Sequence, residues 1–205
     1  MAVHWSAFGL SELGYYVKII AFNGSPRHGG NIELLLNEAL KPLREAGHDI
    51  RVFTLNSMVF IPCQDCGGCT QTGICIQQDE MTGMYDAIRE ADRIILASPV
   101  FFYSLSAQAK AMVDRCQAFW CEKYLLKKII PAGPHGRKGL FLLVGGMKKD
   151  DARQVAEATA KGFFRTCSVP EHGSLFFGGV DAKGDILKHP TALTEAYEAG
   201  KRLLE

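Results

Sequence analysis

Short apolar segments alternate along this chain with segments of helical periodicity, and this alternation constrains the fold more than any other feature. Five runs read as strands that are covered on both faces, at 17–22, 50–55, 93–97, 139–144 and 174–177. Between and after them, apolar residues recur three and four positions apart over 31–46, 81–91, 107–120, 150–164 and 191–204. Strict alternation of this kind predicts an α/β protein with a doubly wound parallel sheet.

The length of 205 residues fits a single domain, which we expect over 17–205, with residues 1–16 as an N-terminal leader outside the fold. Lys and Arg number 23 against 22 Asp and Glu, so the chain lacks the basic excess of a nucleic-acid binder. Its apolar runs are far shorter than the roughly 18–20 residues that span a membrane, and the N-terminus lacks the charged start of a signal peptide. We therefore expect a soluble, cytoplasmic protein that binds neither nucleic acid nor membranes.

The loop over 24–31, after the first expected strand, is suited to bind a phosphate. It leads into a helix N-terminus, where unpaired N–H groups and the helix dipole favour an anion. Ser25 and Asn31 add hydrogen-bond donors, Arg27 adds positive charge, and Asn31 is also predicted to cap the helix. The loop matches neither the Walker pattern nor the dinucleotide fingerprint, which favours a mononucleotide. The alternative is that this loop only turns the chain.

Two more loops at the same edge of the predicted sheet suit a flat heteroaromatic ring. After the third strand the chain carries three consecutive aromatic residues, Phe101, Phe102 and Tyr103, and after the fourth it carries Gly145 and Gly146. Any one of these rings could instead belong to the core. Because the carboxyl ends of parallel strands meet at one edge, the three loops together predict a mononucleotide site there.

The order of these segments closely resembles the flavodoxin-like NAD(P)H-dependent FMN reductase superfamily. The matching residues are 21–27 with Asn31, then 91–102, and finally 110–115. The resemblance implies a flavodoxin-like five-stranded sheet in the order 2-1-3-4-5, with FMN as the cofactor and no catalytic side chain. It also implies a homodimer or a homotetramer.

Carried over residue by residue, the resemblance implies that Ser25, Arg27 and Asn31 hold the FMN phosphate. The residues implied to line the isoalloxazine ring are Pro99, Val100, Phe101, Phe102, Gly145 and Gly146. Two positions depart from the family pattern. Ile32 stands where a hydroxyl residue commonly contacts the phosphate, and Phe101 stands where Tyr is frequent, so one hydrogen bond is lost at each.

Four cysteines, Cys63, Cys66, Cys69 and Cys75, form a C-x2-C-x2-C-x5-C motif within the segment 56–80, which is too long for a plain connector. Successive C-x2-C steps let one short segment present several thiolates to one iron–sulfur cluster. The spacing resembles the compact cysteine motif of the iron–sulfur flavoproteins, a branch of the same superfamily. That resemblance implies one [4Fe-4S] cluster held by these four cysteines in the same subunit as FMN.

Two other interpretations of the motif stay open: a zinc site, although zinc sites usually separate two C-x2-C pairs by a longer loop, and a cysteine-rich loop that only packs. The remaining thiols, Cys116, Cys121 and Cys167, lie in apolar surroundings and are expected to be buried and inert. Asp79 is expected to lie at a helix N-terminus, where the dipole favours its charge, and Arg137 is expected to be solvated.

Together these features predict an FMN-dependent oxidoreductase that passes electrons between a [4Fe-4S] cluster and FMN, with a ferredoxin-like protein or NAD(P)H as the electron donor. One alternative is an NAD(P)H-dependent FMN or quinone reductase without a cluster. A second alternative, from another class, is a non-catalytic module in which a bound flavin or zinc acts as a sensor. Iron and acid-labile sulfide separate the first interpretation from the other two.

Overall fold

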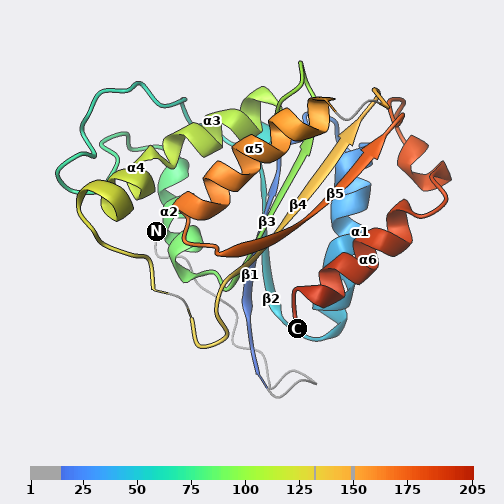
Figure 1. Ribbon diagram of the computed structural model, residues 1–205, viewed down its shortest axis with the longest axis horizontal. Helices are drawn as coiled ribbons and strands as arrows, with labels where there is room; N and C mark the ends of the chain where they lie inside the picture. Colours follow the sequence, from blue (N-terminus) through green and yellow to red (C-terminus); the bar gives the residue numbers. More distant parts are fainter. Residues whose placement is uncertain (1–14, 132, 149–150) are drawn as a thin grey trace.

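The computed structural model describes residues 15–131, 133–148 and 151–205, and it is built on one parallel sheet (Figure 1). The strands are β1 (Lys18–Asn23), β2 (Asp49–Thr54), β3 (Arg93–Pro99), β4 (Lys138–Gly145) and β5 (Glu171–Gly178). Their order across the sheet is β2-β1-β3-β4-β5, and every neighbouring pair is parallel. The predicted fold class and strand order are confirmed.

The helices cover both faces of this sheet. They are α1 (Asn31–Glu45), α2 (Met81–Glu90), α3 (Ala107–Arg115), α4 (Gln117–Trp120), α5 (Asp151–Thr166) and α6 (Ala192–Arg202), with 3-10 turns η1 (Leu55–Ser57) and η3 (Asp185–Lys188). The single helix expected over 107–120 is divided into α3 and α4. It then continues as a π-helical turn, η2 (Cys121–Leu125), a kind of turn that is frequent at functional sites.

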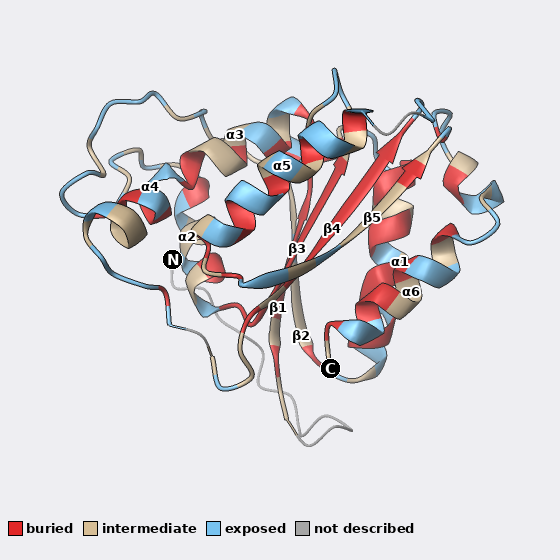
Figure 2. Cartoon of the chain, viewed as in Figure 1, coloured by how far each residue is buried: buried red, intermediate tan, exposed pale blue. Residues whose placement is uncertain are grey.

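The core consists of two apolar layers, one on each face of the sheet. Ile20 and Phe22 of β1 face α2, α3 and α5, whereas Ile19 and Ala21 face α1 and α6. Figure 2 shows the central strands buried along most of their length. Burial on both faces explains why these strands are continuously apolar instead of alternating with polar residues.

A crevice opens at the carboxyl edge of the sheet because β1 and β3 are followed by helices on opposite faces. After β1 the chain turns into α1 on one face, and after β3 it turns into α3 on the other (Figure 1). Such a divergence of two adjacent connections is the switch point at which doubly wound proteins bind ligands.

The start of α1 differs from the prediction. Gly30 is the N-cap residue, Asn31 is already helical, and no side chain caps this end. The capping prediction for Asn31 is therefore wrong. Leu35, Ala39 and Leu43 are fully buried on the face that α1 turns to the sheet, so packing stabilises the helix without a side-chain cap.

Two residues of the expected leader contact the domain. The Tyr15 hydroxyl donates a hydrogen bond to the carbonyl oxygen of Leu204, and the Tyr15 ring stacks on His135 at 4.5 Å between centroids. Tyr16 lies edge-on to His48. Residues 1–14 of the expected leader lie outside the described residues. Within the described part of the chain, every helix is too short or too polar to cross a membrane.

Candidate functional site

A pocket lies at the carboxyl edge of the sheet, above the switch point between β1 and β3. Its lining comes from four loops: Ser25, Pro26, Arg27, Asn31, Ile32, Pro99, Val100, Phe101, Val144, Gly145, Gly146, Val180 and Asp181. The three loops that the sequence predicts to form one site are thus brought together.

Gly24 fixes the first loop against the neighbouring strand and helix. Its N–H donates to the carbonyl oxygen of Ala97 at 2.8 Å, and its own carbonyl accepts from the Ser106 hydroxyl at 2.6 Å. A Cβ on Gly24 would lie 2.8 Å from the Cβ of Ala109, closer than real side chains approach. Glycine is therefore required here for the loop to lie against α3.

Ser25 and Arg27 form the polar end of the pocket. The Ser25 hydroxyl oxygen accepts from the N–H of Arg27 at 3.1 Å, which holds the loop in a tight turn. The Arg27 guanidinium donates one hydrogen bond to the Asp181 carbonyl oxygen at 2.9 Å. A guanidinium has five N–H donors, so Arg27 can bind an anion in the same position.

Asn31 lines the pocket, but its side chain is engaged elsewhere. Its Nδ2 donates to the carbonyl oxygen of Ala182 at 2.9 Å, and its Oδ1 accepts from the N–H groups of Gly184 at 2.9 Å and Ile186 at 3.3 Å. Asn31 thus holds the segment after β5 against the start of α1. Its remaining contribution to a phosphate is its backbone N–H, which, like that of Ile32, has no partner within the helix.

The apolar end of the pocket is formed by the loops after β3 and β4. The N–H of Val100 donates to the Val144 carbonyl oxygen at 2.8 Å, and the backbone passes so close that a Cβ on Gly145 would lie 3.0 Å from the Val100 side chain. Pro99, Val100 and Phe101 form the wall, and Phe101 is 44% exposed at its rim.

Phe102 does not line this pocket. Phe102 and Tyr103 have φ angles of 46° and 64°, and they form the tip of a turn closed by two hydrogen bonds of 3.0 Å between Phe101 and Ser104. Left-handed backbone is unusual for aromatic residues, and strain of this kind occurs mostly at functional sites. The contact between Phe102 and the flavin ring stays a prediction.

Sequence reasoning missed Val180 and Asp181, which follow β5. A signal was present, because the chain carries a glycine pair, Gly178 and Gly179, where β5 ends. The N–H of Val180 donates to the Gly145 carbonyl oxygen at 3.0 Å, so this segment joins the others at the sheet edge. The fifth strand therefore contributes a loop to the site, as do the first, third and fourth.

The residues present fit FMN. One end of the pocket provides hydrogen-bond donors and a helix N-terminus for a phosphate, and the other provides an apolar and aromatic wall for a flat ring. Gly145 and Gly146 allow the backbone to approach the ring edge closely.

A second pocket gathers the cysteines of the motif. Cys63, Cys66, Cys69 and Cys75 all line it, although they come from a largely exposed loop that projects beside α4 (Figure 1). Cys121, which was expected to be an inert buried thiol, lines the same pocket and is 1% exposed. The site therefore contains five thiols, one more than the motif supplies.

The base of the cysteine loop is closed by Asp79 and Arg115. Arg115, on α3, is 1% exposed and forms an ion pair with Asp79 at 2.7 Å, while its Nη1 also donates to the Ile61 carbonyl oxygen at 2.7 Å. Asp79 accepts from the N–H groups of Ile61 at 3.2 Å and Met81 at 3.0 Å. One buried cation thus ties both ends of the loop to the domain.

The electrostatics of this pair favour the charged forms. Burial by itself would raise the pKa of Asp79, but hydrogen bonds from Arg115 and from two backbone N–H groups outweigh it and lower that pKa below its usual value. Burial likewise opposes the charge of Arg115, yet the hydrogen bonds to Asp79 and Tyr85 raise its pKa. Asp79 is at the start of α2 as expected, and its partner Arg115 was not predicted.

Cys69 and Cys121 are in contact, with 3.6 Å between their sulfur atoms. Burial and the adjacent Cys121 thiol raise the pKa of Cys69 to about 12, so without a metal this residue is a neutral thiol. Gln117 lies 3.8 Å from the Cys121 sulfur and donates a hydrogen bond to it.

The chemistry of the cysteine pocket fits a thiolate-bound metal group, although the side chains are not in ligating positions. In the described residues, no group of three or more His, Cys, Asp or Glu side chains is arranged to hold a metal ion. Five thiols nevertheless line one pocket, and soft thiolates select iron–sulfur clusters and zinc. Thiols must lose their protons to bind a metal, and sites of this kind are rarely preformed. The cysteine side chains are therefore expected to take up ligating positions only when the metal binds.

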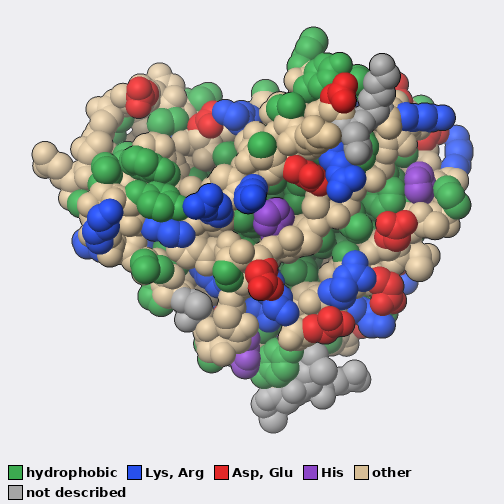
Figure 3. Space-filling model, viewed as in Figure 1, with side chains coloured by type: hydrophobic (Ala, Val, Ile, Leu, Met, Phe, Trp, Pro, Cys, Tyr) green, Lys and Arg blue, Asp and Glu red, His purple; other side chains and the backbone are tan. Residues whose placement is uncertain are grey.

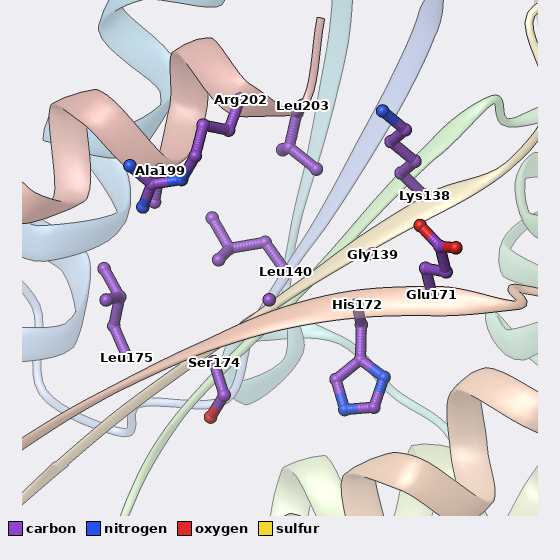
Figure 4. Close-up of a pocket in the computed structure, with 11 residues that line it drawn as sticks. Lys138, Gly139, Leu140, Glu171, His172, Ser174, Leu175, Ala199, Arg202 and Leu203 are labelled. Atoms are coloured by element: carbon purple, nitrogen blue, oxygen red, sulfur yellow. The ribbon is translucent and has the colours of Figure 1, made fainter. Parts of the chain in front are cut away.

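A third hollow lies at the opposite end of the sheet and does not match either prediction (Figure 4). It is bounded by the first residues of β4 and β5 and by the end of α6, with Lys138, Glu171 and Arg202 at its rim. The His172 side chain points to the other face of β5, where it stacks on Phe164. Ligands of doubly wound sheets bind at the carboxyl edge, so this hollow is not the flavin site.

Comparison with known proteins gives one family match and several relatives. A family model described as NADPH-dependent FMN reductase matches residues 17–177. The chain is 39% identical to an iron–sulfur flavoprotein of Methanocaldococcus jannaschii, covering 92% of this chain and 96% of that protein. It is 30% identical to an iron–sulfur flavoprotein of Archaeoglobus fulgidus, covering 80% of each.

Solved structures support the fold. An NAD(P)H:quinone oxidoreductase from Methanothermobacter marburgensis has a TM-score of 0.69 at 19% identity, covering 93% of this chain and 96% of that one. An FMN-dependent NADH-azoreductase from Bacillus anthracis, solved in complex with FMN, has a TM-score of 0.66 at 15% identity, covering 92% and 100%. Both share the flavodoxin-like arrangement described above.

Proposed function

This chain belongs to the NADPH-dependent FMN reductase family of FMN-dependent oxidoreductases, in its iron–sulfur flavoprotein branch, and on that premise we propose that it passes electrons between a [4Fe-4S] cluster and FMN. One observation carries the proposal. The four motif cysteines line one pocket at the C-terminal end of helix α3, and a pocket suited to FMN lies at the other end of that helix.

Helix α3 connects the two pockets. Ser106, at its N-cap, holds the first flavin-pocket loop through Gly24, and Arg115, at its last turn, holds the base of the cysteine loop. Nine residues of helix rise about 13 Å, so the two sites are neighbours within one domain. Electron exchange between them requires no movement of one domain relative to another.

The protein's own residues bind and position the two groups. Ser25, Arg27 and the N-terminus of α1 hold the phosphate, and Pro99, Val100 and Phe101 form the low-dielectric wall of the ring. Arg115 keeps the cysteine loop closed at its base. FMN supplies one- and two-electron chemistry when bound, and the wall and nearby hydrogen bonds tune its potential.

A ferredoxin-like donor fits the surface beside the cysteine loop. Lys and Arg side chains gather over the end of α5 and the segment that follows α4 (Figure 3), and they include Lys123, Lys161 and Arg165. This surface adjoins the cysteine loop at the π-helical turn. There Gly73 of the loop lies directly against Glu122 of the turn, since a Cβ on Gly73 would be only 2.8 Å from the Cβ of Glu122. A basic surface attracts an acidic protein partner and accelerates its association at low salt.

A homodimer or homotetramer is part of the proposal. The cysteine loop exposes four aliphatic side chains, Val59, Ile61, Ile74 and Ile76, each at least 47% exposed. Large apolar side chains exposed on one loop favour an interaction site, and a second copy of the chain would cover them. Light scattering on the purified protein measures the assembly directly.

The test is the iron, zinc and acid-labile sulfide content per subunit of protein purified without oxygen. We expect about four irons and four sulfides with bound FMN. Zinc in their place would make the cysteines a zinc site, and absence of all three would make the loop a packing element. Either result would overturn the electron-transfer proposal and leave the flavin site intact.

The second candidate is an NAD(P)H-dependent FMN or quinone reductase in which hydride reaches FMN directly. The exposed rim at Phe101 favours it, because a nicotinamide or quinone needs an open approach to the ring. Anaerobic addition of NADH or NADPH to the flavin-loaded protein distinguishes the two. Rapid bleaching of the flavin without any cluster would support this candidate, and no bleaching together with no cluster would leave a sensor module.

A further inference from the structure

The contact between Cys69 and Cys121 points to a ligand that lies outside the cysteine motif. Cys121 is the first residue of the π-helical turn η2, it lines the same pocket as the four motif cysteines, and its sulfur is 3.6 Å from that of Cys69. Cys116 and Cys167 are also buried, but neither lines this pocket.

The distance between the two sulfur atoms is that of two thiolates on one metal atom. Tetrahedral coordination with metal–sulfur bonds of about 2.3 Å places neighbouring sulfurs about 3.8 Å apart. A single metal atom can therefore lie within bonding distance of both Cys69 and Cys121. Five thiols then compete for the four thiolate positions of a single cluster.

The surroundings of Cys121 support a ligand role. It belongs to a π-helical turn, which interrupts regular α-helical bonding, and this turn packs directly on the cysteine loop at Gly73. Its neighbour Glu122 forms an ion pair of 2.8 Å with Arg89 of α2, which anchors the turn. Gln117 donates a hydrogen bond to the Cys121 sulfur, a contact that stabilises a thiolate.

The geometry points to Cys69 and Cys121 as alternative ligands for one position of the metal group, so that either thiol sustains binding when the other is absent. This inference rests on the proposed cluster site and deepens it. The exposed loop supplies three thiolates and the buried π-helical turn provides a substitute for the fourth, which protects the site against loss of Cys69.

The test compares Cys69→Ala, Cys121→Ala and the double variant, purified without oxygen. We expect each single variant to keep at least about half of the wild-type iron, and the double variant to lose most of it, because the site then has no ligand at that position. FMN content and circular dichroism report whether each variant folds. Cys116→Ala is the matched control for loss of a buried thiol outside the pocket.

Two outcomes contradict the inference. Cys69→Ala or Cys121→Ala could alone lose as much iron as the double variant, or the double variant could keep its iron. If the wild type itself holds no iron, the proposed function fails, and titration of the reduced protein with Co²⁺ decides the inference separately. In that titration, the double variant should bind Co²⁺ at least about 10–100-fold more weakly than the wild type, since loss of an outer-shell partner alone costs that much affinity. Each single variant should bind Co²⁺ with an affinity close to that of the wild type.

Discussion

The flavin pocket and the cysteine pocket are held together by different kinds of contact. In the flavin pocket, loops at the ends of four strands are joined by main-chain hydrogen bonds, such as Gly24 N–H to Ala97 and Val100 N–H to Val144, both 2.8 Å. In the cysteine pocket, a largely exposed loop is held at its base by side chains, chiefly Asp79 and Arg115. The first pocket shares the stability of the sheet, and the second depends on one buried ion pair.

The largest expected effect comes from Arg115→Met, which removes the cation and leaves Asp79 without its partner. Breaking a buried pair in this way costs about 3–5 kcal/mol, although the loop can open to water and recover part of this. We expect hydrogen exchange to accelerate over 59–80, iron to be lost, and FMN to stay bound. Lys110→Met, an exposed site on the same helix, is the control and should change unfolding by less than about 0.5 kcal/mol. Loss of FMN along with iron would show that the two pockets are not independent.

Asn31→Ala tests the other pocket. It removes three hydrogen bonds to the segment after β5 and leaves a half-buried N–H group on Gly184 and a buried one on Ile186 without this acceptor. We expect a loss of about 2 kcal/mol in urea unfolding and weaker FMN binding, with unchanged iron content. Asn37→Ala, on an exposed turn of the same helix, is the control and should alter neither. If FMN affinity is unchanged, the segment after β5 is not part of the flavin site.

A pH titration separates the two regions by their electrostatics. The pKa of Asp79 is lowered in the folded protein, so its ion pair stabilises the loop above the unfolded value near 3.8 and is lost as pH falls through the lower folded value. Apo protein should therefore show faster exchange at the loop than at β1 and β3 on acidification below about pH 4. In Asp79→Asn, the loop should exchange rapidly at every pH. An acid response that persists in this variant would assign it to another group.

Phe102→Asn carries the smallest expected effect. Phe102 is fully exposed and has a φ of 46°, which Asn tolerates better than an aromatic residue. The variant should be more stable by about 1 kcal/mol, because left-handed backbone costs about 1–2 kcal/mol for most residues. Unchanged FMN affinity would place Phe102 outside the flavin site. A weaker affinity would support the predicted contact and explain why the strain is retained.

The flavin pocket could be predicted from the sequence because its parts are local. Each strand and the glycine- or aromatic-rich loop after it can be recognised in one short window, and parallel strands bring such loops to the same edge. The doubly wound fold was predictable for the same reason, whereas the strand order followed from the family resemblance. The contribution of Val180 and Asp181, from the loop after β5, was missed.

The contacts of Arg115 with Asp79 and Ile61, which hold the base of the cysteine loop, could not be predicted in this way, because they join segments that are distant in the sequence. A signal for Arg115 was nevertheless visible: Ala109, Met112 and Arg115 share the buried face of α3, so a charge stands at an apolar position.

Arg137 is a second buried arginine whose contacts could not be predicted. It was expected to be solvated, and that expectation is wrong: it is 3% exposed and donates to carbonyl oxygens at the ends of α2 and α5. Which carbonyls a buried arginine meets depends on how the helices end in space.

The cysteine loop also starts and ends at the same place. Glu80 N–H donates to the Val59 carbonyl oxygen at 3.3 Å, so the segment leaves the domain and returns to it at adjacent points. A segment with such a closed base can be shortened, lengthened or exchanged without shifting α2, since the entropy of closing a loop rises only slowly with its length. The proposed metal-binding function is thus modular: one flavin scaffold could gain or lose it through an insertion, while the sheet and the flavin pocket stay unchanged.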